Sequence, residues 1–331
     1  MRRRDLVAFI ALGVIWGSNF LFMRDAVQVI APLQVAWLRV CFGALPILGF
    51  AVARGAVRRR DFRFAKHFAA MSILATVLPY VFFVKGAQLL HSGAAGAVSG
   101  VIPLMTAAFA TVFLRDEKLT RARALGILSG LVGVAIVADV RRLYGAASDN
   151  AALLGTLAML AGSAGYASAL VYARRFITPL QLSPVALAAY QTVGAGVLLS
   201  IAAPARGVDA LIEAPRALVA MTLGLGLVGT GIGFILYYRI IERLGAIAAS
   251  SVFYLPPVVA LLLGALVAHE AIGPWQWFGT ALILGGVFLS RQGAPREAKQ
   301  GDPASATDRP PSDPMRVHQF EDGVSARGPN V

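Results

Sequence analysis

Long apolar stretches dominate this sequence and restrict it to one class of fold. A helix crosses the ~30 Å hydrocarbon layer of a membrane with about 20 apolar residues. Ten segments suited to this task lie at approximately 6–23, 33–53, 67–86, 93–114, 122–139, 152–172, 185–203, 217–238, 246–268 and 275–290. Only 14% of the residues are charged, compared with roughly 25% in an ordinary soluble domain. We therefore expect an all-α integral membrane protein with ten transmembrane helices. The spans 217–238 and 246–268 are expected to form an antiparallel hairpin because few residues separate them.

The basic residues test this count of spans. With the N-terminus inside, 17 Lys and Arg residues fall on the inner side and six on the outer side. Such an excess marks the cytoplasmic side of a membrane protein. The distribution therefore predicts a multi-pass protein of the inner (plasma) membrane with both termini in the cytoplasm. It also explains the net charge of +13 without a nucleic-acid partner.

The C-terminal segment 291–331 differs in character from the rest of the chain. It holds six basic and six acidic residues, several prolines and few large apolar side chains. A segment of this kind cannot bury enough apolar surface to fold alone. We expect a disordered cytoplasmic tail.

The two halves of the apolar region resemble each other at a fixed offset. A shift of 153 residues aligns Pro103 with Pro256, Glu117 with Glu270, Gly126 with Gly279 and Gly133 with Gly286. Because each half holds five spans, an odd number, the second half must enter the membrane in the opposite direction. We predict two inverted five-helix repeats, at 1–140 and 151–290. This construction is common in secondary transporters, which bind their substrate where the halves meet.

Several motifs resemble the EamA family of the drug/metabolite transporter superfamily. They are Ile15-Trp16-Gly17-Ser18-Asn19-Phe20, Pro32 with Leu38-Arg39, the Gly/Ala-rich stretch Ser92 to Gly100 with Pro103, and Glu117 with Leu119-Thr120. The second half departs from this pattern, since Gln191 stands in place of Arg39 and Ala164-Gly165-Tyr166 replaces Trp-Gly. The resemblance covers about residues 6–290. It implies alternating-access transport of amino-acid-like compounds, other metabolites or drugs through a central cavity, with export favoured.

Polar and aromatic side chains within the spans are the candidate substrate contacts. Such groups hold a small amphipathic ligand by stacking and hydrogen bonding. The candidates are Trp16, Asn19, Arg39, Tyr80, Tyr166, Gln191, Tyr237 and Tyr254. A charge inside the membrane is costly, so Arg39 is expected either to receive an anionic group of the substrate, or to snorkel outward or bond to helix carbonyls. For each of the other residues, helix packing or an interfacial position is the alternative.

Two mirrored pairs are candidates for helix breaks and gating. Pro103 and Pro256 fall within the fourth and ninth spans, where a proline removes a backbone hydrogen bond. Paired breaks in both halves point to the cavity of a transporter. Glu117 and Glu270 follow the same spans on opposite faces of the membrane. They are expected either to pair with bases in alternation, as each side closes, or to act only at helix ends.

Other functional classes lack the residues they need. An intramembrane enzyme requires paired catalytic groups within the apolar layer, and none of the eleven acids before residue 291 lies in the middle of a span. The single cysteine, Cys41, forms no internal disulfide. We therefore predict no catalytic residues, no metal and no cofactor. The partners expected are a small-molecule substrate and the lipid bilayer, and a homodimer is left open. A non-transporting scaffold or sensor that works through its tail is the main alternative function.

Overall fold

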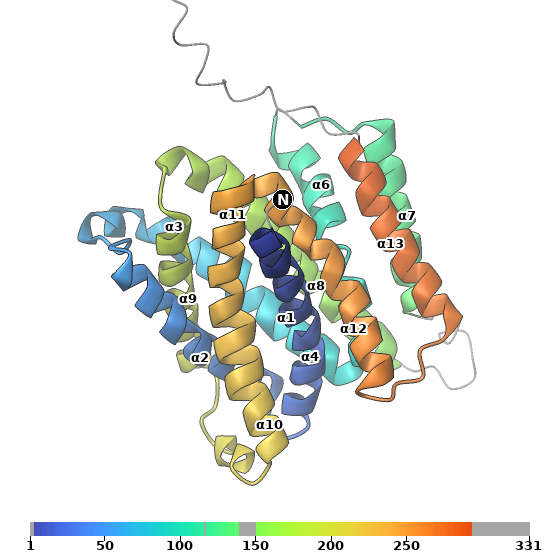
Figure 1. Ribbon diagram of the computed structural model, residues 1–331, viewed down its shortest axis with the longest axis horizontal. Helices are drawn as coiled ribbons and strands as arrows, with labels where there is room; N and C mark the ends of the chain where they lie inside the picture. Colours follow the sequence, from blue (N-terminus) through green and yellow to red (C-terminus); the bar gives the residue numbers. More distant parts are fainter. Residues whose placement is uncertain (1–2, 116, 139–149, 293–331) are drawn as a thin grey trace, which may run out of the picture. The chain divides into compact units, whose positions relative to one another are not determined.

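The computed structural model describes residues 3–115, 117–138 and 150–292, with backbone only at 241, 242, 244–250 and 292. This part of the chain consists of helices and connections, with no β-strand (Figure 1). Seven helical segments are long and apolar enough to cross a membrane: Arg3–Val27, Pro32–Ala53, Arg59–Leu89, Ser92–Phe113, Asn150–Leu180, Pro184–Ala202 and Pro215–Ile240. The predicted spans 122–139 and 275–290 correspond to the helices α7 (Arg121–Val137) and α13 (Pro274–Gln292). The predicted span 246–268 matches α12 (Leu255–Leu266) only in part, because residues 246–250 belong to the preceding helix. The prediction of an all-α membrane fold is confirmed.

Three of the described spans contain wide π-helical turns, and in the sixth the π-helix η4 (Ala173–Ile177) follows α8 (Asn150–Tyr172). In the third span, η1 (Arg59–Phe64) and α3 (Ala65–Ser72) lead into the π-helix η2 (Ile73–Val77) and then α4 (Leu78–Leu89). In the eighth, α10 (Pro215–Val219) leads into the long π-helix η7 (Ala220–Ile232) and α11 (Gly233–Ser250). Such turns are rare and are frequent at functional sites. The π-helices η2 and η7 occur in the same span of each half.

The fourth and ninth spans are interrupted at the mirrored prolines. In the fourth, α5 (Ser92–Ser99) and α6 (Ile102–Phe113) are separated at Gly100 and Val101, with Pro103 in the first turn of α6. In the ninth, the 3₁₀ turn η8 (Ser251–Tyr254) precedes α12, whose first turn holds Pro256. A proline fits the first turn of a helix, where its missing N–H has no intrahelical partner. Both interruptions therefore have a local cause in the sequence.

The eighth and ninth spans differ from the simple hairpin expected from their short connection. Residues 239–245 continue as helix within α11, and α1 (Arg3–Val27) lies between α11 and α12 (Figure 1). Glycines make this insertion possible: Gly13 and Gly17 of α1 lie against Leu255 and Val259 of α12. Small residues let helices in a membrane approach each other closely.

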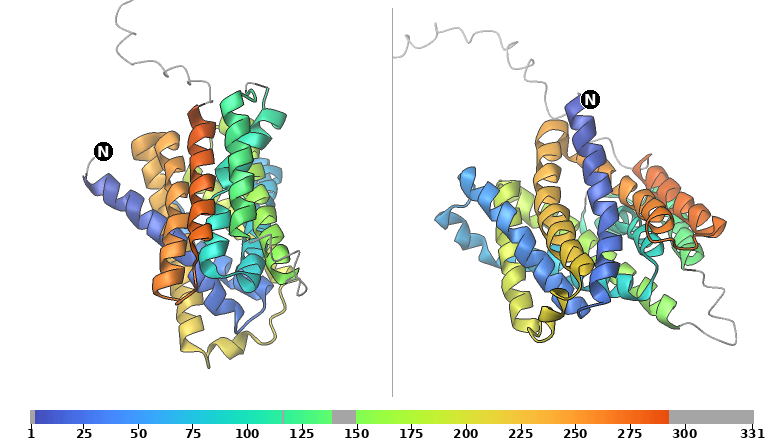
Figure 2. Two further views of the ribbon diagram at one scale, coloured as in Figure 1. Left: turned by 90° about the vertical axis from the view of Figure 1, so that its right-hand side faces the viewer. Right: turned by 60° about the horizontal axis from the view of Figure 1, so that its bottom comes forward.

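The helices α7 and α13 pack side by side (Figures 1 and 2). At their crossing, glycines that correspond under the 153-residue offset meet crosswise, Gly126 with Gly286 and Gly133 with Gly279. Between them, the hydroxyl of Ser129 donates to the carbonyl oxygen of Leu282 at 3.1 Å, and these two positions are themselves 153 residues apart. Replacing each residue of this contact by the residue 153 positions away therefore gives the same contact again. This is expected where a two-fold axis relates two halves.

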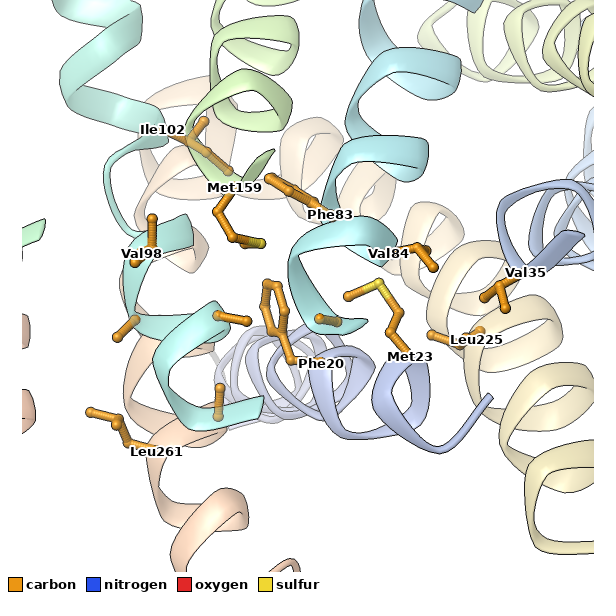
Figure 3. Packing of buried hydrophobic residues seen from close by; sticks show 14 of the residues in the cluster. Phe20, Met23, Val35, Phe83, Val84, Val98, Ile102, Met159, Leu225 and Leu261 are labelled. Atoms are coloured by element: carbon orange, nitrogen blue, oxygen red, sulfur yellow. The ribbon is translucent and has the colours of Figure 1, made fainter. Parts of the chain in front are cut away.

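Apolar side chains form both a core and an outer surface. The largest core cluster joins α1, α4, α5, α8 (Asn150–Tyr172), η7 and α12 through residues such as Phe20, Phe83, Met159, Leu225 and Leu261 (Figure 3). Many other large apolar side chains are exposed on the outside of the helices, among them Leu45, Val112, Leu125, Ile201 and Leu266. Exposed apolar surface of this extent suits lipid as the solvent.

Candidate substrate cavity

A central cavity of about 280 Å³ lies among helices from both halves of the chain. The first half contributes residues of α1, α2 (Pro32–Ala53), α3, η2, α4, α5 and α6. The second half contributes residues of α8, α9 (Pro184–Ala202), α11, η8 and α12, together with Ala173. Of the candidate residues, Trp16, Asn19, Arg39, Tyr80, Tyr166, Gln191, Tyr237 and Pro256 line it. Residues far apart in the sequence are thus brought together at one place.

The remaining candidates lie elsewhere. Tyr254 does not line this cavity, because its ring packs under the guanidinium of Arg291, whose Cζ lies 4.8 Å from the ring centroid. Pro103 is also outside the lining, although the neighbouring Ile102 is part of it. Glu117 and Glu270 lie in the connections that follow α6 and α12, at opposite ends of the bundle (Figure 1).

Nine of the 22 lining residues are aromatic, and Trp16 lies at the centre of one group of rings. Its ring centroid lies 5.3 Å from that of Tyr237, 5.2 Å from that of Phe253 and 6.4 Å from that of Phe234. On another side, Phe83 lies 5.7 Å from Tyr166 and 6.2 Å from Phe20. Rings at these separations attract each other and present apolar faces to a ligand.

Sequence reasoning missed the phenylalanines of this wall, which are Phe20, Phe83, Phe234 and Phe253. A phenylalanine in an apolar span can face lipid, the core or a cavity, and its hydropathy is the same in all three places. The motif Ile15 to Phe20 contained one of the four without singling it out.

Arg39 is the single charged side chain among the described residues that line the cavity, and it is 5% exposed. Its Nε donates to Thr230 Oγ1 at 2.9 Å, and its Nη1 lies 3.7 Å from the sulfur of Met23. Its Cζ stacks 4.0 Å from the ring centroid of Tyr80. In the amide orientation that satisfies both groups, Asn19 accepts from Arg39 Nη2 at 3.1 Å and donates to the carbonyl of Ile15 at 3.3 Å.

Gln191 stands in α9 where Arg39 stands in α2, 152 residues earlier. It lines the same cavity and is 4% exposed. Its Oε1 has no hydrogen-bond partner within the part of the chain that the structure describes. Buried polar atoms are usually hydrogen-bonded, so this oxygen is an exception among the described residues.

At one end of the bundle, Glu270 joins the two halves. Its side chain is 2% exposed and pairs with Arg24 of α1. It also accepts from the backbone N–H and hydroxyl of Ser92, both at 2.7 Å, and from the N–H of Gly93 at 3.0 Å, so it caps the first turn of α5. Burial by itself raises the pKa of Glu270, but the hydrogen bonds from Gly93 and Ser92 and the charge of Arg24 outweigh it, and the pKa lies below its ordinary value.

At the other end, Glu117 has a comparable environment. It pairs with Arg174 of the second half and with Arg123 of α7, whose Nη2 lies 2.5 Å from Glu117 Oε2. Burial raises the pKa of Glu117, but the hydrogen bonds and charges of Arg174 and Arg123 lower it by more, so that the net shift of the pKa is downward. Both acids are paired in this one conformation, and pairing in alternation and a role only at helix ends stay the two predictions for them.

Known proteins resemble this chain over most of its length. The pattern of the EamA-like transporter family matches residues 4–138 and again residues 153–292. The chain is 28% identical over 295 residues to the "Uncharacterized inner membrane transporter YedA" of Escherichia coli strain K12, covering 87% of this chain and 92% of that protein. It is 24% identical over 302 residues to a "Probable amino-acid metabolite efflux pump" of the same strain, covering 88% and 95%. A solved crystal structure shares the fold, with a TM-score of 0.58 at 21% identity over 88% of this chain and 98% of the other. Because the family pattern covers both halves, this chain belongs to the EamA-like transporter family.

Proposed function

We propose that the chain is a secondary transporter that exports small metabolites across the inner membrane by alternating access. The observation that carries this proposal is the cavity of about 280 Å³ lined by both halves of the chain. Pockets for drug-sized ligands range from about 300 to 1,000 Å³, so the cavity suits a small metabolite. A site between two halves is exposed to one side of the membrane and then the other when the halves rock against each other.

Three further observations support this mechanism. The helix breaks before Pro103 and at Pro256 occupy the same span of each half, and Pro256 borders the cavity. The crosswise glycine contacts of α7 and α13 support a division into two inverted repeats. Each repeat is then one EamA-like unit, at 1–140 and 151–290. The relative named as a probable amino-acid metabolite efflux pump supports export and an amino-acid-like substrate.

The orientation proposed places both termini in the cytoplasm. The helix α1 begins and α13 ends at the upper end of the bundle in Figure 1 and in the left view of Figure 2. The excess of 17 basic residues over six assigns this end to the cytoplasmic side. The proposed tail from 291 onward is cytoplasmic in this arrangement; residues 293–331 lie outside the described part of the chain.

Release from proteoliposomes tests the proposal whatever the identity of the substrate. Liposomes containing the full chain are loaded with the small-molecule fraction of a bacterial extract, and mass spectrometry identifies the compounds that leave faster than from protein-free liposomes. A chain that ends at Gln292 is expected to release the same compounds. If well-folded full-length protein releases none, transport is wrong and a scaffold or sensor is favoured; if only the full-length protein releases them, transport requires the tail.

A further inference from the structure

The segment 54–66, which connects α2 to α3, carries an excess of positive charge. It holds six basic residues and a single acid, Asp61. All six basic residues are exposed, whereas Asp61 is buried. Elsewhere at the same end of the bundle, arginines pair with Glu117 or with Asp5. The charge of this segment is therefore left for something outside it to neutralise.

A surface pocket of about 490 Å³ lies where this segment meets residues 180–185 of the second half. Its charged lining consists of four arginines and one acid among the described residues: Arg54, Arg58, Arg60, Arg63 and Asp61. Arg60 Nε lies 4.0 Å from Asp61 Oδ1, but one carboxylate cannot neutralise four guanidinium groups. Guanidinium groups bind phosphate oxygens through pairs of charged hydrogen bonds. The pocket therefore suits a phosphate.

Tyr190 of α9 holds the backbone of this segment in place. Its hydroxyl accepts from the N–H of Arg58 at 2.9 Å and donates to the carbonyl oxygen of the same residue at 3.0 Å. Its ring stacks on Phe68 at 4.4 Å and meets Phe62 edge-on at 5.7 Å. Because the pocket is already fixed by the other half of the chain, little conformational entropy of its backbone is lost when a ligand binds.

The pocket lies at the level of a membrane surface. The helix α1 crosses the bundle and α2 returns, so the segment 54–66 lies at the end where α1 begins (Figure 1). Val57 and Phe62, next to the arginines, are exposed apolar side chains. Basic and apolar side chains together are typical of the boundary between headgroups and acyl chains. A soluble anion would make no use of the apolar ones.

We propose that this pocket binds the headgroup of an anionic phospholipid of the cytoplasmic leaflet, with the arginines on its phosphate and with Val57 and Phe62 against its acyl chains. The choice of leaflet rests on the orientation given in the proposed function. The cytoplasmic leaflet carries anionic lipids, and basic pockets on this side of a membrane protein bind them. The same arginines help to orient the chain, but orientation depends on their number and requires neither a pocket nor a fixed backbone.

A comparison of lipids tests the chemistry of the site. The purified full-length chain in detergent is titrated with cardiolipin, phosphatidylglycerol and phosphatidylcholine of the same acyl chains, and native mass spectrometry measures the bound lipid. Wild-type protein is expected to bind both anionic lipids more tightly than phosphatidylcholine. Cardiolipin, with two phosphates, should bind most tightly because the arginines of the pocket outnumber its acid. Glycerol phosphate, which has the phosphate without acyl chains, should not displace the bound lipid at equal concentration.

Two matched double variants place the site. Arg58→Gln with Arg60→Gln should weaken the binding of the anionic lipids by roughly 10- to 30-fold, and each single replacement by about 5-fold, since each basic residue at a membrane surface contributes about this factor. Arg115→Gln with Arg121→Gln is the control. It removes the same charge from exposed positions on the same proposed side, outside the pocket, and should keep the wild-type affinity. Thermal unfolding without added lipid shows that each variant is folded.

The outcomes separate this proposal from transport. Equal affinity for anionic lipids and phosphatidylcholine overturns it, and so do equal losses in the two double variants, which would reflect net charge alone. Displacement of the lipid by glycerol phosphate would mean a site for soluble anions and would also overturn it. Protein that releases compounds from proteoliposomes without any preference for anionic lipids contradicts only the lipid site. Protein that binds the lipids at this pocket and releases nothing contradicts only the proposed function.

Discussion

Glu270, in the connection between α12 and α13, forms an ion pair with Arg24 near the end of α1. This ion pair connects the second half of the chain to the first. The same acid caps α5 through Ser92 and Gly93. At the opposite end, the corresponding Glu117 of the first half pairs with Arg174 of the second. Each half therefore supplies one acid and one arginine to contacts that connect the halves.

Replacing Glu270 should destabilise the folded protein. In Glu270→Gln the side chain keeps its shape, but Arg24 loses its counter-ion and the hydrogen bonds from Ser92 and Gly93 lose their charged acceptor. Charged hydrogen bonds contribute about 1.5–3 kcal/mol each at most, and they are not additive. We expect a loss of about 1–3 kcal/mol in the free energy of unfolding, measured by denaturation in detergent. Glu213→Gln, at an exposed position, is the control; equal stability of the two variants would show that the Glu270 contacts contribute nothing.

The contribution of Glu270 should depend on pH in one direction. Its pKa in the folded protein lies below the ordinary value of 4.5, so the unfolded chain takes up a proton first as the pH falls. The stabilisation is therefore complete above that ordinary value and is lost as the pH falls through the lower folded pKa. The difference in unfolding temperature between wild type and Glu270→Gln should be largest near neutral pH and shrink under acid conditions. If the difference in unfolding temperature stayed constant from neutral to acid pH, the stabilisation could not be assigned to the ionised carboxylate of Glu270.

The close crossing of α7 and α13 should not accommodate even one methyl group added at its glycines. A Cβ at Gly286 would overlap the backbone carbonyl of Gly126, whereas a Cβ at Gly285 would meet nothing within 4 Å. Overpacking costs about 1–3 kcal/mol, and here the obstacle is backbone. Gly286→Ala is expected to lower the unfolding temperature and the yield of monodisperse protein, and Gly285→Ala to leave both unchanged or improved. Comparable losses in both variants would mean that the close contact at the crossing is not responsible, because Ala favours a helix more than Gly does.

Replacing Tyr237 should weaken the binding of substrate, whereas replacing Tyr254 should not. Tyr237 lines the cavity beside Trp16, whereas Tyr254 lies under Arg291 and outside the lining. An aromatic contact is worth about 0.5–1.5 kcal/mol beyond its burial. Tyr237→Ala is therefore expected to weaken the binding of any transported compound by about 3-fold to 10-fold or more, and Tyr254→Ala to leave it unchanged. Titration of each folded variant with the released compounds measures these affinities. A larger loss of affinity in Tyr254→Ala than in Tyr237→Ala would place the substrate outside this cavity.

Much of the candidate site was predictable because polar groups are rare within apolar spans. Arg39, Asn19 and Gln191 stand out in the sequence, and the structure brings them to one cavity. Tyr254 was predicted by the same reasoning, yet Arg291 covers it. Tyr237 lies in α11 and Tyr254 at the end of the 3₁₀ turn η8, and residue type does not report which of the two side chains lines the cavity.

The membrane environment explains which features of the protein the amino-acid sequence determined by itself. Lipid requires spans of a set length and apolarity, loops with a biased charge, and prolines at tolerated breaks, and all of these are local properties of the sequence. The 153-residue offset further predicts which helices correspond. The insertion of α1 between α11 and α12, the pairing of Glu270 with Arg24, and the ring of phenylalanines around the cavity were decided only in three dimensions. They depend on how closely glycine-bearing helices approach and how each is rotated about its axis, and hydropathy is the same for every such arrangement.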